Sequence, residues 1–128
     1  MVNRKNASEQ AEKLKLELRR GTLVLAALSQ LRSPQYGYSL MQDLADRGLD
    51  VEQGTLYPLL RRLDEQGLLE SSWNVEGSRP RKYYQLSAAG AEVLEILSIQ
   101  WRSLIEAMND LMSEPSQEVS EGDGNGTD

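Results

Sequence analysis

The sequence contains neither cysteine nor histidine. Without cysteine the chain has no disulfide, no thiolate nucleophile and no thiolate metal ligand, a composition that suits a reducing cytoplasm. The absence of histidine removes the commonest general base and the commonest zinc ligand. The sequence also lacks a glycine-rich loop of the kind that cradles phosphate groups. We therefore expect a protein that is not an enzyme, with no catalytic residue, no metal site and no cofactor.

Long hydrophobic runs are also missing. No apolar stretch approaches the roughly 18 residues that span a membrane. The first residues, MVNRKNASEQAEK, lack the apolar core of a signal peptide. A chain of 128 residues with 39% hydrophobic content fits one domain with a modest core. We expect a cytoplasmic protein without a membrane partner.

Negative charge is unevenly distributed along the chain. The formal net charge is −6, from 14 basic and 20 acidic residues. The last sixteen residues hold five acids and no base, while residues 1–82 hold 13 bases and 11 acids. A tail rich in Ser, Gly and acids, with almost nothing to bury, is typical of disorder. Global acidity is therefore no argument against a nucleic-acid partner.

Two helices are predicted before residue 48. Residues 8–31 are rich in leucine and alanine, with Ser8 as a candidate N-cap. Gly21 marks either a kink or the join between an amphipathic segment and a buried one. A shorter helix is expected over residues 39–47, and Gly48 is a suitable residue to end it.

A third helix is predicted in the stretch GTLYPLLRRLDEQG. Its leucines recur at three- and four-residue spacing and predict one buried face: Leu56, Leu59, Leu60 and Leu63. If Gly54 or Thr55 is the N-cap, Pro58 falls in the first turn, where no backbone hydrogen bond is lost. Gly67 then ends the helix.

A β-hairpin and a long helix complete the pattern. Residues 68–75 and 82–87 alternate as strands around a loop that contains glycine and proline. Ser87 is the predicted N-cap of a last helix that reaches about Met112. The fold class is therefore mainly α with a small β-hairpin, a winged helix-turn-helix followed by a long C-terminal dimerisation helix. The expected divisions are a lead-in at 1–20, the winged domain at 21–86, the dimerisation helix at 87–112 and a disordered acidic tail at 113–128.

The third helix carries the first group of candidate DNA contacts. Thr55 and Tyr57 lie near its N-terminus, and Arg61 follows one turn after Tyr57. In a helix-turn-helix this end of the second helix enters the major groove, where hydroxyl and guanidinium groups reach bases and phosphates. An amphipathic helix with solvated arginines is the alternative interpretation. The basic hairpin immediately downstream favours DNA binding.

The hairpin tip carries the second group. The turn Gly77–Pro80 holds cations away from the domain, and Arg79 at such a tip is suited to a minor groove. Arg81 and Lys82 are expected to contact flanking phosphates. A charged, solvated turn is the alternative. Because Tyr83 and Tyr84 alternate, one ring is expected in the core and the other outside.

The last helix has an apolar seam. Its spacing of 3, 4, 3, 4, 3 is that of coiled-coil packing, and the residues are Leu94, Leu97, Trp101, Leu104, Met108 and Leu111. A symmetric dimer would bury such a seam and present two recognition helices to DNA. A helix folded back on its own domain is the alternative. Trp101 is either a core residue of the dimer or, with its symmetry mate, one wall of a pocket for a planar aromatic effector.

Three stretches resemble the PadR family of bacterial transcriptional regulators: YGYSL (36–40), GTLYPLLRRLDEQGLLES (54–71) and EGSRPRKYYQLSAAG (76–90). The resemblance covers roughly residues 20–112. It implies a dimeric winged-helix repressor that binds a double-stranded DNA operator. The single C-terminal helix looks like the smaller subclass, in which some members bind flat aromatic compounds beside a tryptophan at the position of Trp101. Ser78 and Ser87 depart mildly from the family pattern, which often has glycine and threonine there.

The leading hypothesis is therefore a homodimeric, sequence-specific DNA-binding repressor that a small aromatic or drug-like effector releases. The predicted DNA-binding residues include one from YGYSL and are Tyr38, Thr55, Tyr57, Arg61, Arg79, Arg81 and Lys82. The alternative is a winged-helix protein–protein adaptor without DNA binding. An adaptor would be expected to place acidic or apolar residues, not arginines, at the tip of the wing.

Overall fold

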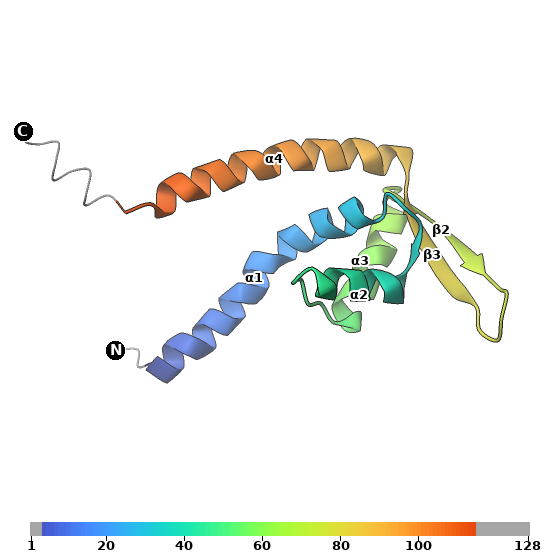
Figure 1. The fold of residues 1–128 in the computed structure, drawn as a ribbon, viewed down its shortest axis with the longest axis horizontal. Coiled ribbons are helices and arrows are strands. Elements are labelled where there is room, and N and C mark those ends of the chain that lie inside the picture. The colour runs from blue at the N-terminus through green and yellow to red at the C-terminus, as the bar shows by residue number, and fades with distance from the viewer. Residues whose placement is uncertain (1–3, 115–128) are drawn as a thin grey trace, which may run out of the picture. The chain divides into compact units, whose positions relative to one another are not determined.

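The computed structural model describes residues 4–114 of the chain. Most of the predicted acidic tail and the first three residues of the lead-in lie outside the described residues. The elements are α1 (Arg4–Gln30), β1 (Gln35–Tyr36), α2 (Gly37–Asp46), α3 (Gln53–Glu65), β2 (Leu69–Asn74), β3 (Arg81–Leu86) and α4 (Ala88–Met112) (Figure 1). This architecture confirms the predicted fold class, a mainly α chain with a winged helix-turn-helix and a long C-terminal helix. The chain divides into two compact units, residues 1–97 and residues from 98 onward.

Helix α1 begins earlier than the sequence predicts. It starts at Arg4, so Ser8 lies within the helix and the prediction that it is the N-cap is wrong. The helix continues through Gly21 without a break. Residues 6–21 are exposed, whereas Leu23, Ala27 and Leu28 are buried. Of the two interpretations of Gly21, the structure therefore supports the join between an exposed segment and a buried one.

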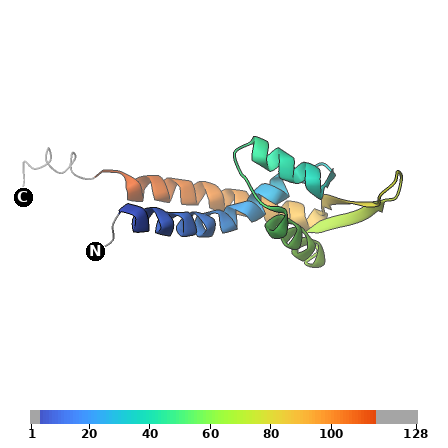
Figure 2. The same ribbon diagram turned by 90° about the horizontal axis from the view of Figure 1, so that it is seen from below.

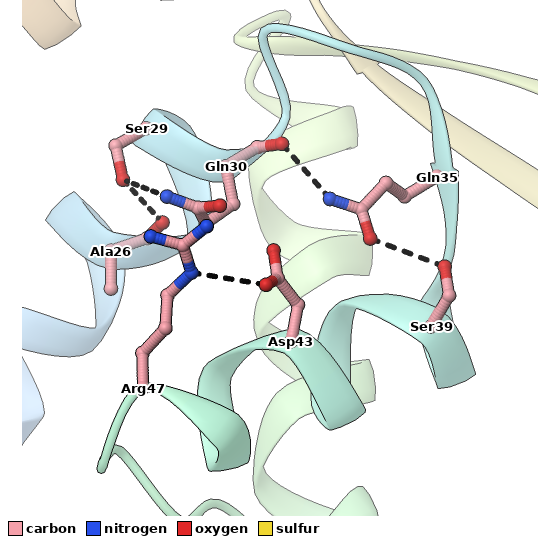
Figure 3. A network of polar contacts seen from close by, with 7 residues as sticks. All are labelled: Ala26, Ser29, Gln30, Gln35, Ser39, Asp43 and Arg47. Carbon is pink, nitrogen blue, oxygen red and sulfur yellow. Dashed lines mark hydrogen bonds and ion pairs between the residues drawn. The ribbon is translucent and has the colours of Figure 1, made fainter.

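The turn between α1 and α2 is held by side chains of its own residues (Figure 3). Gln35 donates a hydrogen bond of 3.1 Å from Nε2 to the carbonyl of Gln30, which lies at the end of α1. Its Oε1 accepts one of 3.2 Å from the hydroxyl of Ser39 in the first turn of α2. One glutamine thus satisfies an unpaired carbonyl of one helix and bonds to the next. At the other end of α2, Arg47 pairs with Asp43 at 3.0 Å.

Helix α3 corrects the expected position of Pro58. The N-cap is Glu52, so Pro58 lies inside the helix, beyond its first turn. At this position proline removes the hydrogen bond to the carbonyl of Gly54, and its ring crowds that carbonyl. The four predicted leucines form the buried face. Gly48 and Gly67 follow α2 and α3 with φ of 92° and 81°, the left-handed conformation predicted for residues that end a helix.

The hairpin belongs to a three-stranded antiparallel sheet in the order β1-β3-β2. Strands β2 and β3 pair from Leu69↔Leu86 to Asn74↔Arg81. The short strand β1, which was not predicted from the sequence, pairs Gln35 with Tyr84 on the other edge of β3. Both views show the hairpin projecting beyond α2 and α3 (Figure 1 and Figure 2).

The start of α4 is fixed to the end of α3 and to the sheet. The hydroxyl of Ser87 accepts a hydrogen bond of 2.9 Å from the Gly90 amide and donates one of 2.7 Å to the Gly67 carbonyl. The predicted N-cap is confirmed. Gly90 is buried, and a Cβ there would overlap the Leu68 carbonyl oxygen. No side chain can therefore be added at this position without moving backbone.

The core is almost entirely leucine. Its buried members are Leu23, Ala27, Leu28, Leu31, Leu40, Leu44, Leu56, Leu59, Leu60, Leu63, Leu69 and Leu94, from α1, α2, α3, β2 and the first turns of α4. The core packs one face of α3 against the rest of the winged unit. The opposite face of α3 is exposed to solvent. Among residues 4–114, no helix is long and apolar enough to cross a membrane.

Candidate nucleic-acid interface

A surface hollow of about 1000 Å³ lies between the start of α2, the N-terminal half of α3 and the β2–β3 hairpin. Six of the seven predicted DNA-binding residues line it: Tyr38, Tyr57, Arg61, Arg79, Arg81 and Lys82. These include four cations, and Glu76 is the one acid in the lining. The hollow is therefore a positive surface on a chain whose net charge is −6.

The outer face of α3 borders this hollow. Gly54, Pro58 and Arg61 recur at four- and three-residue spacing opposite the buried leucines, and all three are exposed. A Cβ at Gly54 would meet nothing within 4 Å, so packing within the chain does not require glycine there. Thr55 is exposed but does not line the hollow, so among the predicted contacts it is the one that the structure places apart.

The ring of Tyr57 occupies space that a side chain at Gly37, on the neighbouring helix, would fill. It is half-buried, and a Cβ at Gly37 would lie 2.9 Å from Cε1 of its ring. Such a contact is too short for van der Waals packing, so a larger residue at position 37 must displace the ring. Gly37 therefore sets the position of Tyr57 at the border between α2 and α3.

The outer face of the wing carries a stack of three side chains. The rings of Tyr36 and Tyr83 stack at 4.2 Å between centroids, with an angle of 17° between their planes. The guanidinium of Arg81 lies 4.8 Å from the centroid of the Tyr36 ring. Asn74 donates a hydrogen bond of 2.7 Å to the Tyr36 hydroxyl. Tyr36 thus joins the turn before α2 to both strands of the hairpin.

The two stacked tyrosines have opposite shifts in pKa. Hydrogen bonds from Tyr83 and then from Asn74 lower the pKa of Tyr36, and the charge of Arg81 acts in the same direction. The pKa of Tyr83 is raised, first because its hydroxyl donates that hydrogen bond to Tyr36. On the other face, burial raises the pKa of Tyr84, and the nearby carboxylate of Asp64 adds to this. Tyr84 packs on the core and Tyr83 does not, so the predicted division between the two rings is observed.

Lys82 points to the opposite face of β3 from Arg81, since neighbouring residues of a strand alternate. Its ammonium group lies 3.8 Å from Oδ2 of Asp64 on α3. It also lies 5.7 Å from the centroid of the Trp73 ring and 5.6 Å from that of Tyr84. Arg81 and Lys82 were predicted from the sequence as one pair of phosphate contacts. In the structure their side chains lie on opposite faces of β3 and contact different residues.

The predicted seam of α4 is also divided. Leu94 is 5% exposed and belongs to the core of the winged unit, and Leu97 packs against that core. The later members are open to solvent in the single chain: Trp101 at 40%, Leu104 at 46%, Met108 at 46% and Leu111 at 74%. Leu94 therefore has little surface left for a partner.

Trp73 and Tyr36 line the hollow and were not among the predicted DNA contacts. Trp73, on strand β2, is 62% exposed and lines the hollow. Its register partner is Lys82, a pairing that follows from the hairpin once its strand ends are known. Tyr36 lies in a two-residue strand that has no periodicity to detect. Among residues 4–114 no cluster of three or more acidic residues is arranged to hold a metal ion.

Comparison with known proteins agrees with this geometry. The transcriptional regulator PadR-like family matches residues 24–96. A crystal structure of a PadR family transcriptional regulator from Eggerthella lenta DSM 2243 is 48% identical, covers 85% of this chain and 97% of its own, and has a TM-score of 0.80. A PadR-like transcription factor from Bacteroides fragilis is 36% identical over 77% of this chain and 98% of its own, with a TM-score of 0.66.

Two curated relatives match over shorter regions. Transcriptional regulator Rv3488 of Mycobacterium tuberculosis is 42% identical over 59 residues, 46% of this chain and 55% of the relative. Transcriptional activator GvpE2 of Halobacterium salinarum is 36% identical over 77 residues, 59% of this chain and 38% of the relative. The chain thus matches about half or less of the length of each. The prediction that the chain is not an enzyme is confirmed, because its family and its relatives are regulators of transcription. Since the family match and the similarity in fold agree, the chain belongs to the PadR family of transcriptional regulators.

Proposed function

We propose that this regulator binds double-stranded DNA sequence-specifically through the hollow between α3 and the wing. The observation that carries the proposal is the charge of that surface, four cations against one acid beside the exposed face of a helix-turn-helix. A polyanion is the partner that such a surface favours. A protein–protein adaptor, the alternative, would not need this concentration of arginines. The proposal requires access to DNA, in keeping with the cytoplasmic location expected from the sequence.

The proposed roles follow from where each side chain lies. The N-terminal half of α3 enters the major groove, and Arg61, one turn after Tyr57 on the exposed face, reaches phosphates or guanine edges. Gly54 and Pro58 have small side chains, so DNA can approach the backbone of α3 closely on its outer face. Arg79, at the exposed tip, enters the minor groove, and Arg81 binds phosphate.

The double variant Arg79→Ala/Arg81→Ala tests this proposal. We expect weaker binding and a salt dependence of log K that is less steep by about 1 for each phosphate that the variant no longer neutralises. The probe is the duplex that the wild-type chain enriches from a pool of randomised duplexes, titrated in a mobility-shift assay at several salt concentrations. Arg47→Ala is the matched control, because Arg47 is exposed but does not line the hollow. Unchanged affinity and salt slope in the double variant would remove the wing from the interface.

We further propose that the chain acts as a homodimer through the exposed part of the α4 seam. Its apolar residues keep heptad spacing and are largely open in the single chain. A second copy offers the same seam, so a symmetric pair buries both. Two recognition helices would then address two half-sites of an operator. The proposed interface is Leu97, Trp101, Leu104, Met108 and Leu111, whereas Leu94, predicted from the sequence as part of it, belongs to the core of the winged unit.

Repression relieved by a planar aromatic effector is the proposed mode of action. The repressor role rests on the family resemblance alone, and GvpE2 is itself named an activator. A reporter placed behind the enriched duplex decides the sign, with higher expression expected when the regulator is absent. An effector can release DNA only if it binds the released form of the dimer more tightly.

The effector site is tested by tryptophan fluorescence. The chain has two tryptophans, and Trp73 is exposed in the hollow, so the measurement uses a Trp73→Phe variant in which Trp101 is the only tryptophan, excited at a wavelength that tyrosine does not absorb. We expect planar aromatic compounds, including cationic ones, to quench its fluorescence. A broad panel of such compounds that leaves the emission unchanged would contradict the proposed site.

A further inference from the structure

The C-terminal half of α3 carries an acid that faces the wing. Asp64 accepts a hydrogen bond of 2.6 Å from the hydroxyl of Ser71 on β2, and its Oδ2 lies 3.8 Å from the ammonium of Lys82 on β3. One carboxylate therefore connects both strands of the hairpin to α3, the helix that is proposed to enter the major groove. The side chains of Lys82 and Asp64 are 31% and 25% exposed, so the pair is partly shielded from solvent.

Lys82 is confined by more than this ion pair. Its ammonium lies near the rings of both Trp73 and Tyr84, on the face of β3 that also carries Leu86. By contrast, Arg81 lies on the other face, beside Tyr36. A cation that already pairs with a carboxylate gains less from a phosphate than a free one does.

We propose that Lys82 and Asp64 are positioning residues that set the angle of the wing to the recognition helix and thereby contribute to discrimination between DNA sequences. Neither acts as a direct phosphate contact. The inference rests on the proposed DNA binding, and it replaces the phosphate role expected for Lys82 from the sequence. The wing and α3 contact separate parts of an operator. The angle between them therefore determines whether both can make their contacts on the same DNA site.

The substitution Asp64→Asn separates an effect of charge from an effect of positioning, because the two predict opposite changes in the affinity for DNA. Removing an acid beside a DNA-binding hollow should strengthen binding to any duplex if charge were all that mattered. Positioning predicts weaker binding to the enriched duplex, because the ion pair that fixes the wing is lost. Asparagine still accepts the hydrogen bond from Ser71, so the fold is expected to persist.

The experiment measures the affinity ratio between the enriched duplex and a shuffled duplex of the same composition. We expect Asp64→Asn and Lys82→Met each to lower this ratio about threefold, the scale of a partly exposed ion pair. Lys82→Met should leave the salt slope unchanged, whereas Arg81→Ala, which removes the proposed phosphate contact, lowers it by about 1. The double variant should lose no more than either single one, because both remove the same pair. Lys82→Arg, which can still pair with Asp64, should retain the ratio.

Three outcomes would overturn the inference. If the Asp64→Asn variant binds the enriched duplex more tightly than the wild type, the charge of Asp64 matters more than its contact with Lys82. If Lys82→Met lowers the salt slope by about 1 and weakens both duplexes equally, Lys82 is a phosphate contact and the proposed DNA binding still stands. If the wild-type chain enriches no duplex, the proposed function fails, and this inference fails with it. Melting temperatures of the variants, measured in parallel, separate a loss of fold from each of these results.

Discussion

The winged unit and the second half of α4 use similar apolar spacing with opposite results. In α3, leucines at three- and four-residue intervals are almost fully buried against α1, α2 and the sheet. From Trp101 to Leu111 the same spacing leaves every large apolar side chain at least two-fifths exposed. The winged unit completes its own core. The later seam residues, from Trp101 to Leu111, remain at least two-fifths exposed in the single chain.

The difference shows what periodicity can and cannot predict. A period of 3.5 to 3.6 identifies the face of a helix that is to be buried, but it does not say which surface covers it. For α3 the cover comes from the same chain. For the seam, exposed Trp, Leu and Met in a row form the kind of apolar patch that marks an interaction surface. We have proposed a second copy as that cover.

The strongest way to break the winged unit is Gly90→Ala. The added Cβ would overlap the Leu68 carbonyl and lie 2.9 Å from Cδ1 of Leu86, so backbone must move. We expect a loss of about 3 kcal/mol in the free energy of unfolding and a melting temperature lower by roughly 10–20 °C, measured by circular dichroism. Gly21→Ala is the matched control, because its Cβ would meet nothing within 4 Å in a continuous helix. It should stabilise the chain by about 0.5–1 kcal/mol. An equal effect of the two substitutions would contradict the tight packing inferred at Gly90.

Leu104→Glu is the corresponding test of the seam. A charge at the centre of the proposed interface should weaken dimerisation by at least about tenfold, because it is buried without a partner. Light scattering coupled to size exclusion is expected to give twice the 14.4 kDa chain mass for the wild type and a single chain mass for the variant. Ser103→Glu adds the same charge beside the seam and should remain dimeric. A wild-type chain that is monomeric at micromolar concentration would show that the seam has another occupant.

The smallest expected effect belongs to the stack on the outer face of the wing. Tyr36→Phe keeps the ring that stacks on Tyr83 but removes the acceptor of the hydrogen bond from Asn74. We expect a loss of about 1 kcal/mol in the free energy of unfolding, measured in urea. Tyr38→Phe is the control, since the Tyr38 hydroxyl accepts from Gln42 at an exposed position. It should be nearly neutral, and a similar loss in both variants would mean that the bond between Tyr36 and Asn74 does not anchor the wing.

Much of the fold could be predicted because its signals are local. The leucine face of α3, the glycines that end α2 and α3, and the cap at Ser87 all depend on neighbours within a few residues. The cationic residues of the wing were found in the same way, from a short run between two strands.

The features that the sequence did not predict have separate physical causes. Strand β1 exists because β3 offers it an edge, and two residues carry no period. Pro58 was misplaced because the N-cap is Glu52, which has no side-chain capping hydrogen bond and no capping signature. The sequence predicted Arg81 and Lys82 together as phosphate contacts, which stays a prediction, and strand alternation places their side chains on opposite faces of β3. The pairing of Lys82 with Asp64, eighteen positions earlier, could not be read without the fold.

The order of strands in the sheet has a consequence for how the chain folds. Leu69 pairs with Leu86 across a short hairpin, whereas Gln35 pairs with Tyr84 across α2, α3 and the whole of β2. Closing the longer loop costs more entropy, and β1 has no strand to join until β3 is in place. The hairpin is therefore expected to form early, with β1 and the turn before α2 adding late. On this pathway the aromatic stack at Tyr36 is a late event, and substitutions there should speed unfolding more than they slow folding.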